Sequence, residues 1–113
     1  MFKETIFSKI LSGDIPCDEV YSDEQCLAFK DIAPQAPVHI LIIPRKKLVS
    51  LREVNEQDKE LLGHLLYVSS KIAKQQNLEN WRTVINTGES AGQTVFHLHI
   101  HIMGGRSLQW PPG

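Results

Sequence analysis

The sequence predicts an α+β fold in which a five-stranded antiparallel sheet carries one long and one short helix. Three observations predict it: a long run with helical spacing of apolar residues, a shorter run of that kind near the N-terminus, and five segments rich in β-branched or aromatic residues. The chain has 113 residues, of which 42% are hydrophobic and 22% are charged. This size and composition predict a single domain, residues 1–113, with one core.

The two helices are predicted from apolar spacing and from their end signals. The short helix is expected from about Thr5 to Ser12, with Gly13 as its stop. The long helix is expected within residues 54–77, where Asn55 caps its start and Asp58 complements the exposed amides. Its expected apolar stripe consists of Leu61, Leu62, Leu65, Leu66, Ile72 and Ala73.

The five strands are expected at residues 19–22, 25–32, 36–45, 81–88 and 94–105. The first two form a hairpin, and prolines bound the third. Few long crossover connections are available, so consecutive strands are expected to pair antiparallel, with the long helix covering one face.

Bulk properties exclude several classes of partner. A formal net charge of −1 provides no general attraction to nucleic acid or to acidic membranes. The two cysteines, Cys17 and Cys26, do not make a disulfide framework, which is typical of a reducing compartment. No segment approaches the roughly 20 apolar residues of a membrane helix, and the N-terminus does not resemble a signal peptide. A cytoplasmic location is therefore expected, with no membrane or nucleic-acid partner.

Three of the five histidines, His97, His99 and His101, alternate along the last expected strand. Alternation places them on one face of the sheet, about 6.6 Å from one to the next. The intervening apolar residues are expected in the core. Those residues are Phe96, Leu98, Ile100 and Ile102.

Three interpretations of this histidine row can be compared. Two of the imidazoles could converge on a zinc ion, but a third ligand would have to be His39 or a carboxylate from another strand. A solvated polar face is the second interpretation. The third is nucleophilic and acid–base chemistry, which uses imidazoles at separate positions rather than converging on one point. The spacing favours this third interpretation.

The segment "NTGESAGQT", residues 86–94, directly precedes the row. Its glycines would allow backbone amides at Gly92 to Thr94 to form a nest around an anion such as phosphate. The segment lacks the spacing and the lysine of a P-loop, and an ordinary hairpin turn would explain it equally well.

The stretch "QTVFHLHIHI" matches the His-φ-His-φ-His-φ-φ motif (φ, apolar) of the histidine triad superfamily. The resemblance extends through "CLAFKDIAPQAPVHILIIPRK", "LLGHLL" and "INTGESAGQ" to "GGRSLQWPPG", which resembles the histidine triad nucleotide-binding (Hint) branch. It implies an α+β homodimer, with the sheet extended across the two subunits, that binds an AMP-like purine nucleotide. It further implies hydrolysis of adenosine phosphoramidates, AMP-amines or aminoacyl-adenylates without a cofactor.

The resemblance also implies roles for individual residues. His99 would be the nucleophile that becomes nucleotidylated, His101 would contact the phosphate, His97 would orient His99, and His39 would support the row from a neighbouring strand. Nucleotide-binding residues, besides His99 and His101, would be Asp31, Ile32, Asn86, Gly92, Gln93 and Thr94.

Two departures from the family's pattern bear on metal binding. Zinc-binding relatives carry C-x-x-C where this chain has Thr5 and Ser8, and relatives often carry histidine at the position of Lys47. No metal is therefore expected.

The leading hypothesis is a phosphoramidate hydrolase that forms a covalent nucleotidyl-histidine. The alternative is a nucleotide-binding regulatory or interaction module with only slow, incidental hydrolysis, and a metal-binding protein is the third hypothesis. Trp110, in a tail that Pro111 and Pro112 hold extended, is expected to pack near the cleft of the partner subunit.

Overall fold

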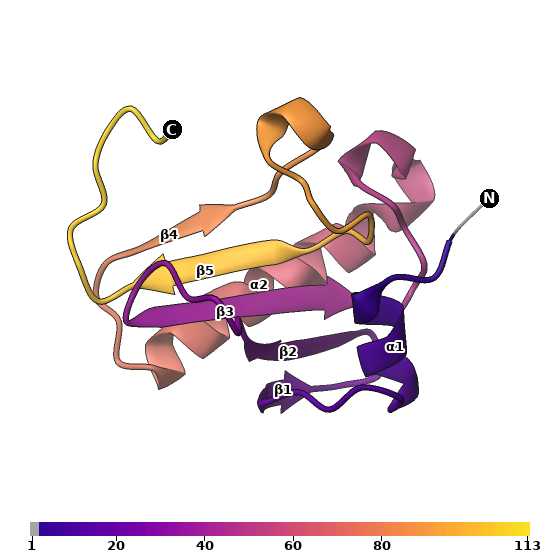
Figure 1. Ribbon diagram of the computed structural model, residues 1–113, viewed down its shortest axis with the longest axis horizontal. Coiled ribbons are helices and arrows are strands. Elements are labelled where there is room, and N and C mark those ends of the chain that lie inside the picture. The colour runs from indigo at the N-terminus through magenta and orange to yellow at the C-terminus, as the bar shows by residue number, and fades with distance from the viewer. Residues whose placement is uncertain (1–2) are drawn as a thin grey trace.

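The computed structural model describes residues 3–113 and confirms the predicted α+β architecture (Figure 1). The helices and strands, in chain order, are α1 (Ile6–Ser12), β1 (Glu19–Ser22), β2 (Cys26–Lys30), β3 (Val38–Pro44), α2 (Lys59–Gln75), β4 (Trp81–Val84) and β5 (Ile100–Gly104). Short 3-10 turns lie at Leu51–Glu53, Glu56–Asp58 and Glu89–Ala91. Within the described residues, neither helix is long and apolar enough to cross a membrane.

The sheet is antiparallel, with the strand order β1-β2-β3-β5-β4 (Figure 1). Consecutive pairing is confirmed for β1, β2 and β3, but the expectation that β3 pairs with β4 is wrong. Strand β5 lies between β3 and β4 instead, and the side chains of its Ile100 and Ile102 are buried. The short β4 is only partly buried and occupies one edge of the sheet, and β1 occupies the other.

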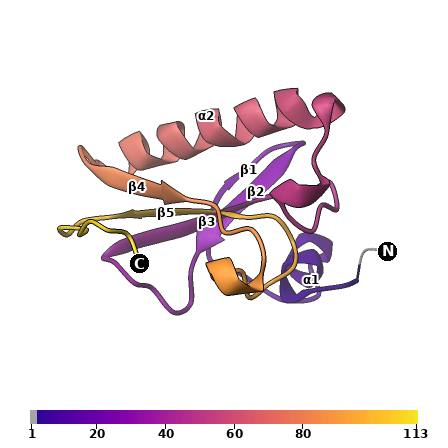
Figure 2. The ribbon, with the colours of Figure 1, turned by 90° about the horizontal axis from the view of Figure 1, so that it is seen from above.

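The two faces of the sheet are covered differently (Figure 2). Helix α2 covers one face, while α1 and the segment before β5 lie on the other. Alternation along β2 and β3 divides the core accordingly, because successive side chains point to opposite faces. The α2 face buries, among others, Cys26, Ala28, Ile40, Ile42, Leu65, Val68 and Ile72. The α1 face buries Phe7, Leu27, Phe29, Leu41 and Ile43.

The short helix begins where the sequence predicts, whereas α2 begins at Lys59, after a 3-10 turn that Asn55 caps. Thr5 caps α1 in a capping box with Ser8, and Gly13 ends it at a φ of 87°. Asn55 caps the 3-10 turn that leads into α2, and Asp58 completes that capping box.

The buried face of α2 consists of Leu65, Val68, Ser69, Ile72 and Ala73. Leu61 and Leu62 pack against this core from its margin. The expected stripe is wrong at Leu66, which is 50% exposed, because that position lies outside the i, i+3, i+4, i+7 row that starts at Leu65.

The last strand is shorter than expected, because it begins at Ile100. The ladder with β3 stops at Ile42, and Pro44 has no N–H to extend it. The segment before Ile100 makes a different backbone contact, because the Leu98 N–H donates to the Leu48 carbonyl at 2.7 Å. Phe96 is 42% exposed, so its expected core position is wrong, whereas Leu98 is buried as expected.

Candidate active site

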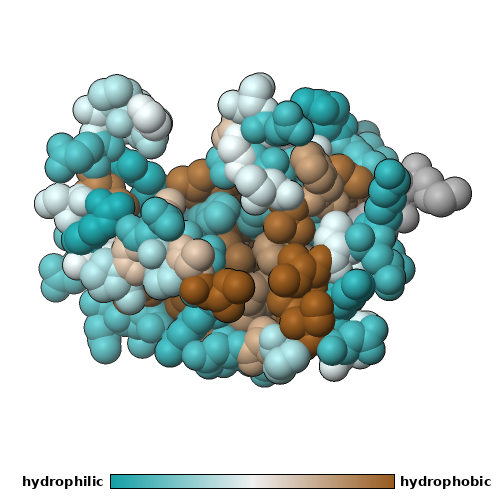
Figure 3. Space-filling model, in the orientation of Figure 1, coloured by the Kyte–Doolittle hydropathy of each residue, from teal (hydrophilic) through white to brown (hydrophobic). Residues whose placement is uncertain are grey.

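A cavity of about 370 Å³ opens on the α1 face of the sheet. Hydrophobic surface gathers beside α1 on this face (Figure 3). The apolar walls of the cavity include Ile6, Phe7, Ile10, Ile15, Phe29, Leu41 and Val95. Its polar lining includes Asp31, Thr94, His99 and His101. Apolar walls with a few convergent polar groups are typical of a small-molecule site.

The geometry of His99 defines which of its nitrogens is reactive. Its Nδ1 lies 2.7 Å from the backbone oxygen of His97. A carbonyl only accepts, so Nδ1 carries the proton and Nε2 keeps its lone pair. The ring of Phe7 packs edge-on against the imidazole, with 4.9 Å between the ring centroids. His99 is 6% exposed and lines the cavity, so its imidazole has a fixed orientation in the cavity wall.

His97 contributes to the site through its backbone. Its imidazole is fully buried, and Nε2 donates to the Pro44 carbonyl at 2.9 Å. The expectation that three imidazoles share one face at a spacing of 6.6 Å is therefore wrong, because His97 and His99 precede the strand. Only His99 and His101 line the cavity, with their ring centroids 5.0 Å apart.

His39, on β3, fixes the tautomer of His101. The backbone N–H of Gln35 donates to His39 Nδ1 at 3.0 Å, which leaves the proton of a neutral His39 on Nε2. That Nε2 lies 2.9 Å from His101 Nδ1 and 3.4 Å from Asp31 Oδ2. Because His39 Nε2 donates to His101 Nδ1, that Nδ1 is an acceptor. The proton of a neutral His101 therefore lies on its Nε2.

Burial keeps all four imidazoles of the site neutral at pH 7. It lowers the pKa of His39, His97 and His99 below the ordinary value of 6.5. The pKa of His101 is lowered to about 4, by burial first and then by the neighbouring His99 and His39. A neutral imidazole is the form that attacks as a nucleophile.

Gln35 and Arg106 belong to this arrangement, although no pattern in the sequence predicted a role for them. Arg106 donates to the Gln35 carbonyl from Nε at 3.0 Å and from Nη2 at 2.8 Å. It thereby holds the loop whose N–H sets the His39 tautomer. Gln35 acts through its backbone, which no sequence pattern reveals, whereas Arg106 stands in the "GGR" that follows the histidines.

The segment before the histidines is a tight glycine turn, with a φ of 90° at Gly88 and 102° at Gly92. The expected nest of amides is largely wrong. The Gly92 N–H donates to Glu89 at 3.0 Å and the Gln93 N–H donates to Gly88 at 3.1 Å, so both are used inside the turn. Thr94 is exposed and lines the cavity.

Gln93 and Asn86 shape this turn with their side chains. The Gln93 amide is buried, donates to the Val49 and Val95 carbonyls, and accepts from the Gly88 N–H. Asn86 donates to the Gly92 carbonyl at 3.4 Å. Neither residue lines the cavity, so both support the loop.

Asp31 and Ile32 both line the cavity from the end of β2. Asp31 Oδ1 accepts from the Ala33 N–H at 2.8 Å, which leaves Oδ2 facing His39. Ile32 is 93% exposed, so its side chain is available to a ligand. The structure thus brings Asp31, Ile32, Thr94, His99 and His101 to one cavity, with His39 and His97 behind it.

The chain matches known proteins over almost its whole length. Residues 4–109 match the family model described as "Scavenger mRNA decapping enzyme C-term binding". An uncharacterized HIT-like protein of Synechococcus elongatus is 58% identical, with all of both chains covered. The 14 kDa zinc-binding protein of Zea mays is 54% identical over 96% of this chain and 88% of its own.

Solved structures show the same fold. A HIT family hydrolase from Legionella pneumophila superposes with a TM-score of 0.95 at 44% identity, covering 97% of this chain and 100% of its own. A histidine triad nucleotide-binding protein from Candida albicans superposes with a TM-score of 0.81 at 29% identity, covering 96% of this chain and 83% of its own.

Proposed function

Because the chain belongs to the histidine triad (HIT) family and has the fold of HIT family hydrolases, we propose that it hydrolyses purine nucleoside phosphoramidates through a covalent nucleotidyl-His99. The observation that carries this proposal is the hydrogen bond from His99 Nδ1 to the His97 carbonyl. It gives one cavity-lining imidazole a fixed lone pair on Nε2, which is what attack on phosphorus requires.

The cavity has a place for each part of an AMP-like substrate. Its apolar walls around Phe7 and Phe29 accept a purine, and Asp31 with Ile32 stands where the ribose would lie. His101, with its proton on Nε2, and the Thr94 hydroxyl donate to phosphoryl oxygens. Such fixed donors stabilise the charge that develops on those oxygens.

The reaction proceeds in two displacements. His99 Nε2 attacks phosphorus, the P–Nε2 bond forms, and the P–N bond to the substrate amine breaks. The amine leaves with a proton from solvent. Water then attacks phosphorus and loses a proton to solvent, the P–Nε2 bond breaks, AMP is released and Nε2 regains its lone pair. Two such steps replace one difficult displacement.

We further propose a homodimer, as the Hint branch implies. Strand β4 leaves an open sheet edge beside a cleft of about 620 Å³ that residues 77–82 and 105–108 line. Apolar side chains also lie exposed on α2, where Leu66 is 50% and Tyr67 is 66% exposed. Trp110 is 82% exposed and absent from the lining of its own cavity, which supports the proposal that it packs against a partner.

The test is single-turnover reaction with an adenosine phosphoramidate and mass spectrometry of the trapped protein. His99→Ala should abolish turnover and adduct but retain AMP binding, because the cavity walls are intact. His97→Ala should cost less, because the backbone carbonyl that orients His99 remains. His64→Ala, on α2, is the matched control and should retain the wild-type rate.

Two outcomes would contradict the proposal. An adduct on His97 or His101 would refute the assignment of the nucleophile. A wild-type protein that binds AMP tightly but shows neither turnover nor adduct would support the alternative function, a nucleotide-binding module.

A further inference from the structure

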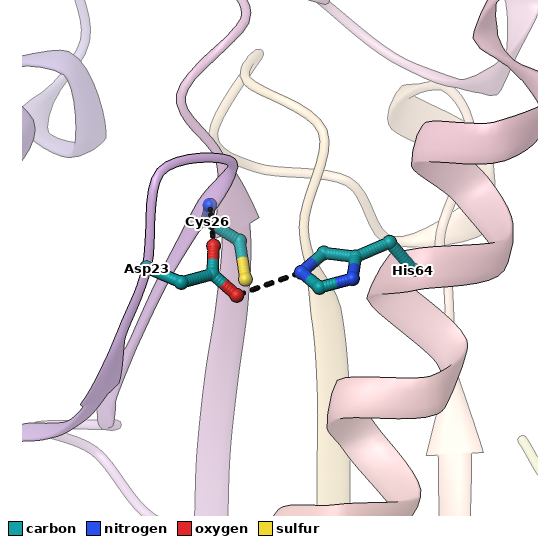
Figure 4. Close-up of side chains that lie close together, drawn as sticks. All are labelled: Asp23, Cys26 and His64. Atoms are coloured by element: carbon teal, nitrogen blue, oxygen red, sulfur yellow. Dashed lines mark hydrogen bonds and ion pairs between the residues drawn. The ribbon is translucent and has the colours of Figure 1, made fainter.

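Three potential metal ligands meet on the α2 face of the sheet, away from the active-site cavity (Figure 4). Asp23 lies in the β1–β2 turn, Cys26 begins β2, and His64 projects from α2. One oxygen, one sulfur and one nitrogen of these side chains all lie within 4.8 Å of one another. The chemistry proposed for the active site uses none of the three.

The Asp23 carboxylate is oriented before any ligand arrives. Its Oδ1 accepts from the backbone N–H groups of Gln25 at 2.7 Å and of Cys26 at 2.8 Å. This turns Oδ2 toward His64, whose Nε2 is 2.7 Å away (Figure 4). The Tyr21 hydroxyl also donates to Oδ2 at 2.9 Å. Hydrogen bonds of this kind orient ligating carboxylates in metal sites.

The turn that carries Asp23 is itself held in place. Arg45 donates from Nε to the Asp23 carbonyl at 2.8 Å and from Nη2 to the Ser22 hydroxyl at 2.7 Å. The positions of Asp23 and Cys26 relative to each other are therefore set by the backbone. His64 comes from a different element, helix α2.

The sulfur ligand of the cluster belongs to a buried side chain, whereas the oxygen and nitrogen ligands belong to partly exposed side chains. Cys26 is fully buried, whereas the side chains of Asp23 and His64 are 24% and 27% exposed. An ion can therefore reach the cluster from solvent and keep a water molecule on its open side. Three protein ligands and one water complete a tetrahedral set.

We propose that Asp23, Cys26 and His64 bind one zinc-like divalent cation, with water as the fourth ligand. Sulfur, imidazole nitrogen and carboxylate oxygen are the donors that zinc takes, whereas calcium and magnesium take oxygen. Zinc bonds of about 2.0–2.3 Å place tetrahedral ligand atoms roughly 3.3–3.8 Å apart. The imidazole would therefore move back from Asp23 by about 1 Å or less.

Binding replaces protons with the cation. The Cys26 thiol loses its proton to solvent, and the proton of His64 moves from Nε2 to Nδ1 through solvent. Without a cation, burial and then the Asp23 carboxylate raise the pKa of the thiol to about 12, and His64 Nε2 is hydrogen-bonded to Asp23. The cation would connect α2 to the β1–β2 turn and stabilise the fold.

Asp31, His39 and His101 form another group whose donor atoms lie within 4.8 Å of one another. That group belongs to the active site and contains no sulfur. Sulfur ligation therefore distinguishes the two clusters, and the remaining cysteine, Cys17, provides a matched control.

The experiment is a titration of the chelator-treated full-length protein with Co²⁺, followed by near-ultraviolet sulfur-to-cobalt charge transfer, and then displacement by Zn²⁺. We expect one equivalent of cobalt with a charge-transfer band. Cys26→Ser should lose the band and His64→Gln should weaken binding by at least about tenfold. Cys17→Ser should retain both. Zn²⁺ should raise the Tm of the wild type and of Cys17→Ser, but not of His64→Gln.

A wild-type protein without the band, or a band that persists in Cys26→Ser, would overturn the proposal and leave a hydrogen-bonded network. His64→Gln keeps the test valid if Cys26→Ser does not fold, because His64 is partly exposed on a helix surface. Phosphoramidate turnover by the chelator-treated wild type is measured in parallel. Its presence or absence does not affect the metal result, so the two proposals fail separately.

Discussion

At the scale of single residues, the site depends on which nitrogen of each imidazole carries the proton. The His97 carbonyl fixes it for His99, and the Gln35 N–H fixes it for His39 and, through it, for His101. Burial lowers the pKa values of the three imidazoles in these hydrogen bonds. Neutral, oriented imidazoles are therefore built into the fold before a nucleotide binds.

Burying neutral histidines makes stability depend on pH. The folded pKa of His101 is about 4 and its unfolded value is about 6.5, so between these values the unfolded chain binds more protons. The contribution of neutral His101 to the free energy of unfolding is therefore complete above pH 7 and is lost as the pH falls toward 4. We expect His101 alone to lower the free energy of unfolding by about 2 kcal/mol between pH 7 and pH 5.

Urea denaturation at both pH values measures this loss in the wild type and in His101→Asn. The variant should show a smaller loss, because an amide does not titrate. An equal loss in both proteins would show that His101 is not the group responsible.

At the scale of elements, the C-terminal segment holds the loop between β2 and β3. Arg106 makes two hydrogen bonds to the Gln35 carbonyl, and this loop supplies the N–H that sets the His39 tautomer. We expect Arg106→Ala to lower kcat by about 10- to 100-fold with little change in KM, because misplaced catalytic groups are costly while the cavity walls remain.

Arg106→Lys should recover part of the rate, since an ammonium keeps one donor near the carbonyl. Arg82 provides the matched control, because it also donates to a backbone carbonyl of the C-terminal segment, that of Gln109. Arg82→Ala should leave the imidazole ¹⁵N shifts unchanged, whereas Arg106→Ala should shift those of His39 and His101. Unshifted resonances in Arg106→Ala would disprove this positioning role.

At the scale of the whole molecule, the open β4 edge and the exposed apolar residues of α2 favour association of two copies. An unpaired sheet edge is a risk of aggregation unless it is covered or paired. We expect light scattering at micromolar concentration to give the mass of a dimer. Leu66→Glu should shift the protein toward monomer, because it places a charge in the contact that we propose.

Phe96→Glu provides the comparison, because Phe96 is also exposed but lies in the segment on the opposite face of the sheet. It should remain dimeric. A wild-type protein with the mass of a monomer would refute the proposed dimer and the proposed place of Trp110 against it.

The sequence by itself determined the local elements and two of the histidines that line the cavity. Apolar spacing, Thr5, Gly13 and Asn55 located both helices, and five β-rich segments located the strands. These signals are local, because period and capping depend on residues a few positions apart. The alternating histidines likewise singled out His97, His99 and His101, and the last two line the cavity.

Only the tertiary structure decided the strand order, the start of β5 and the partners of each imidazole. Pro44 ends a ladder with a strand distant in the sequence, so His97 turns inward and acts through its carbonyl. Arg106 reaches Gln35 across 71 positions, and His64 reaches Asp23 across 41. Backbone donors and long-range contacts leave no periodic pattern in the chain, because packing of the whole fold, rather than local propensity, brings those atoms together.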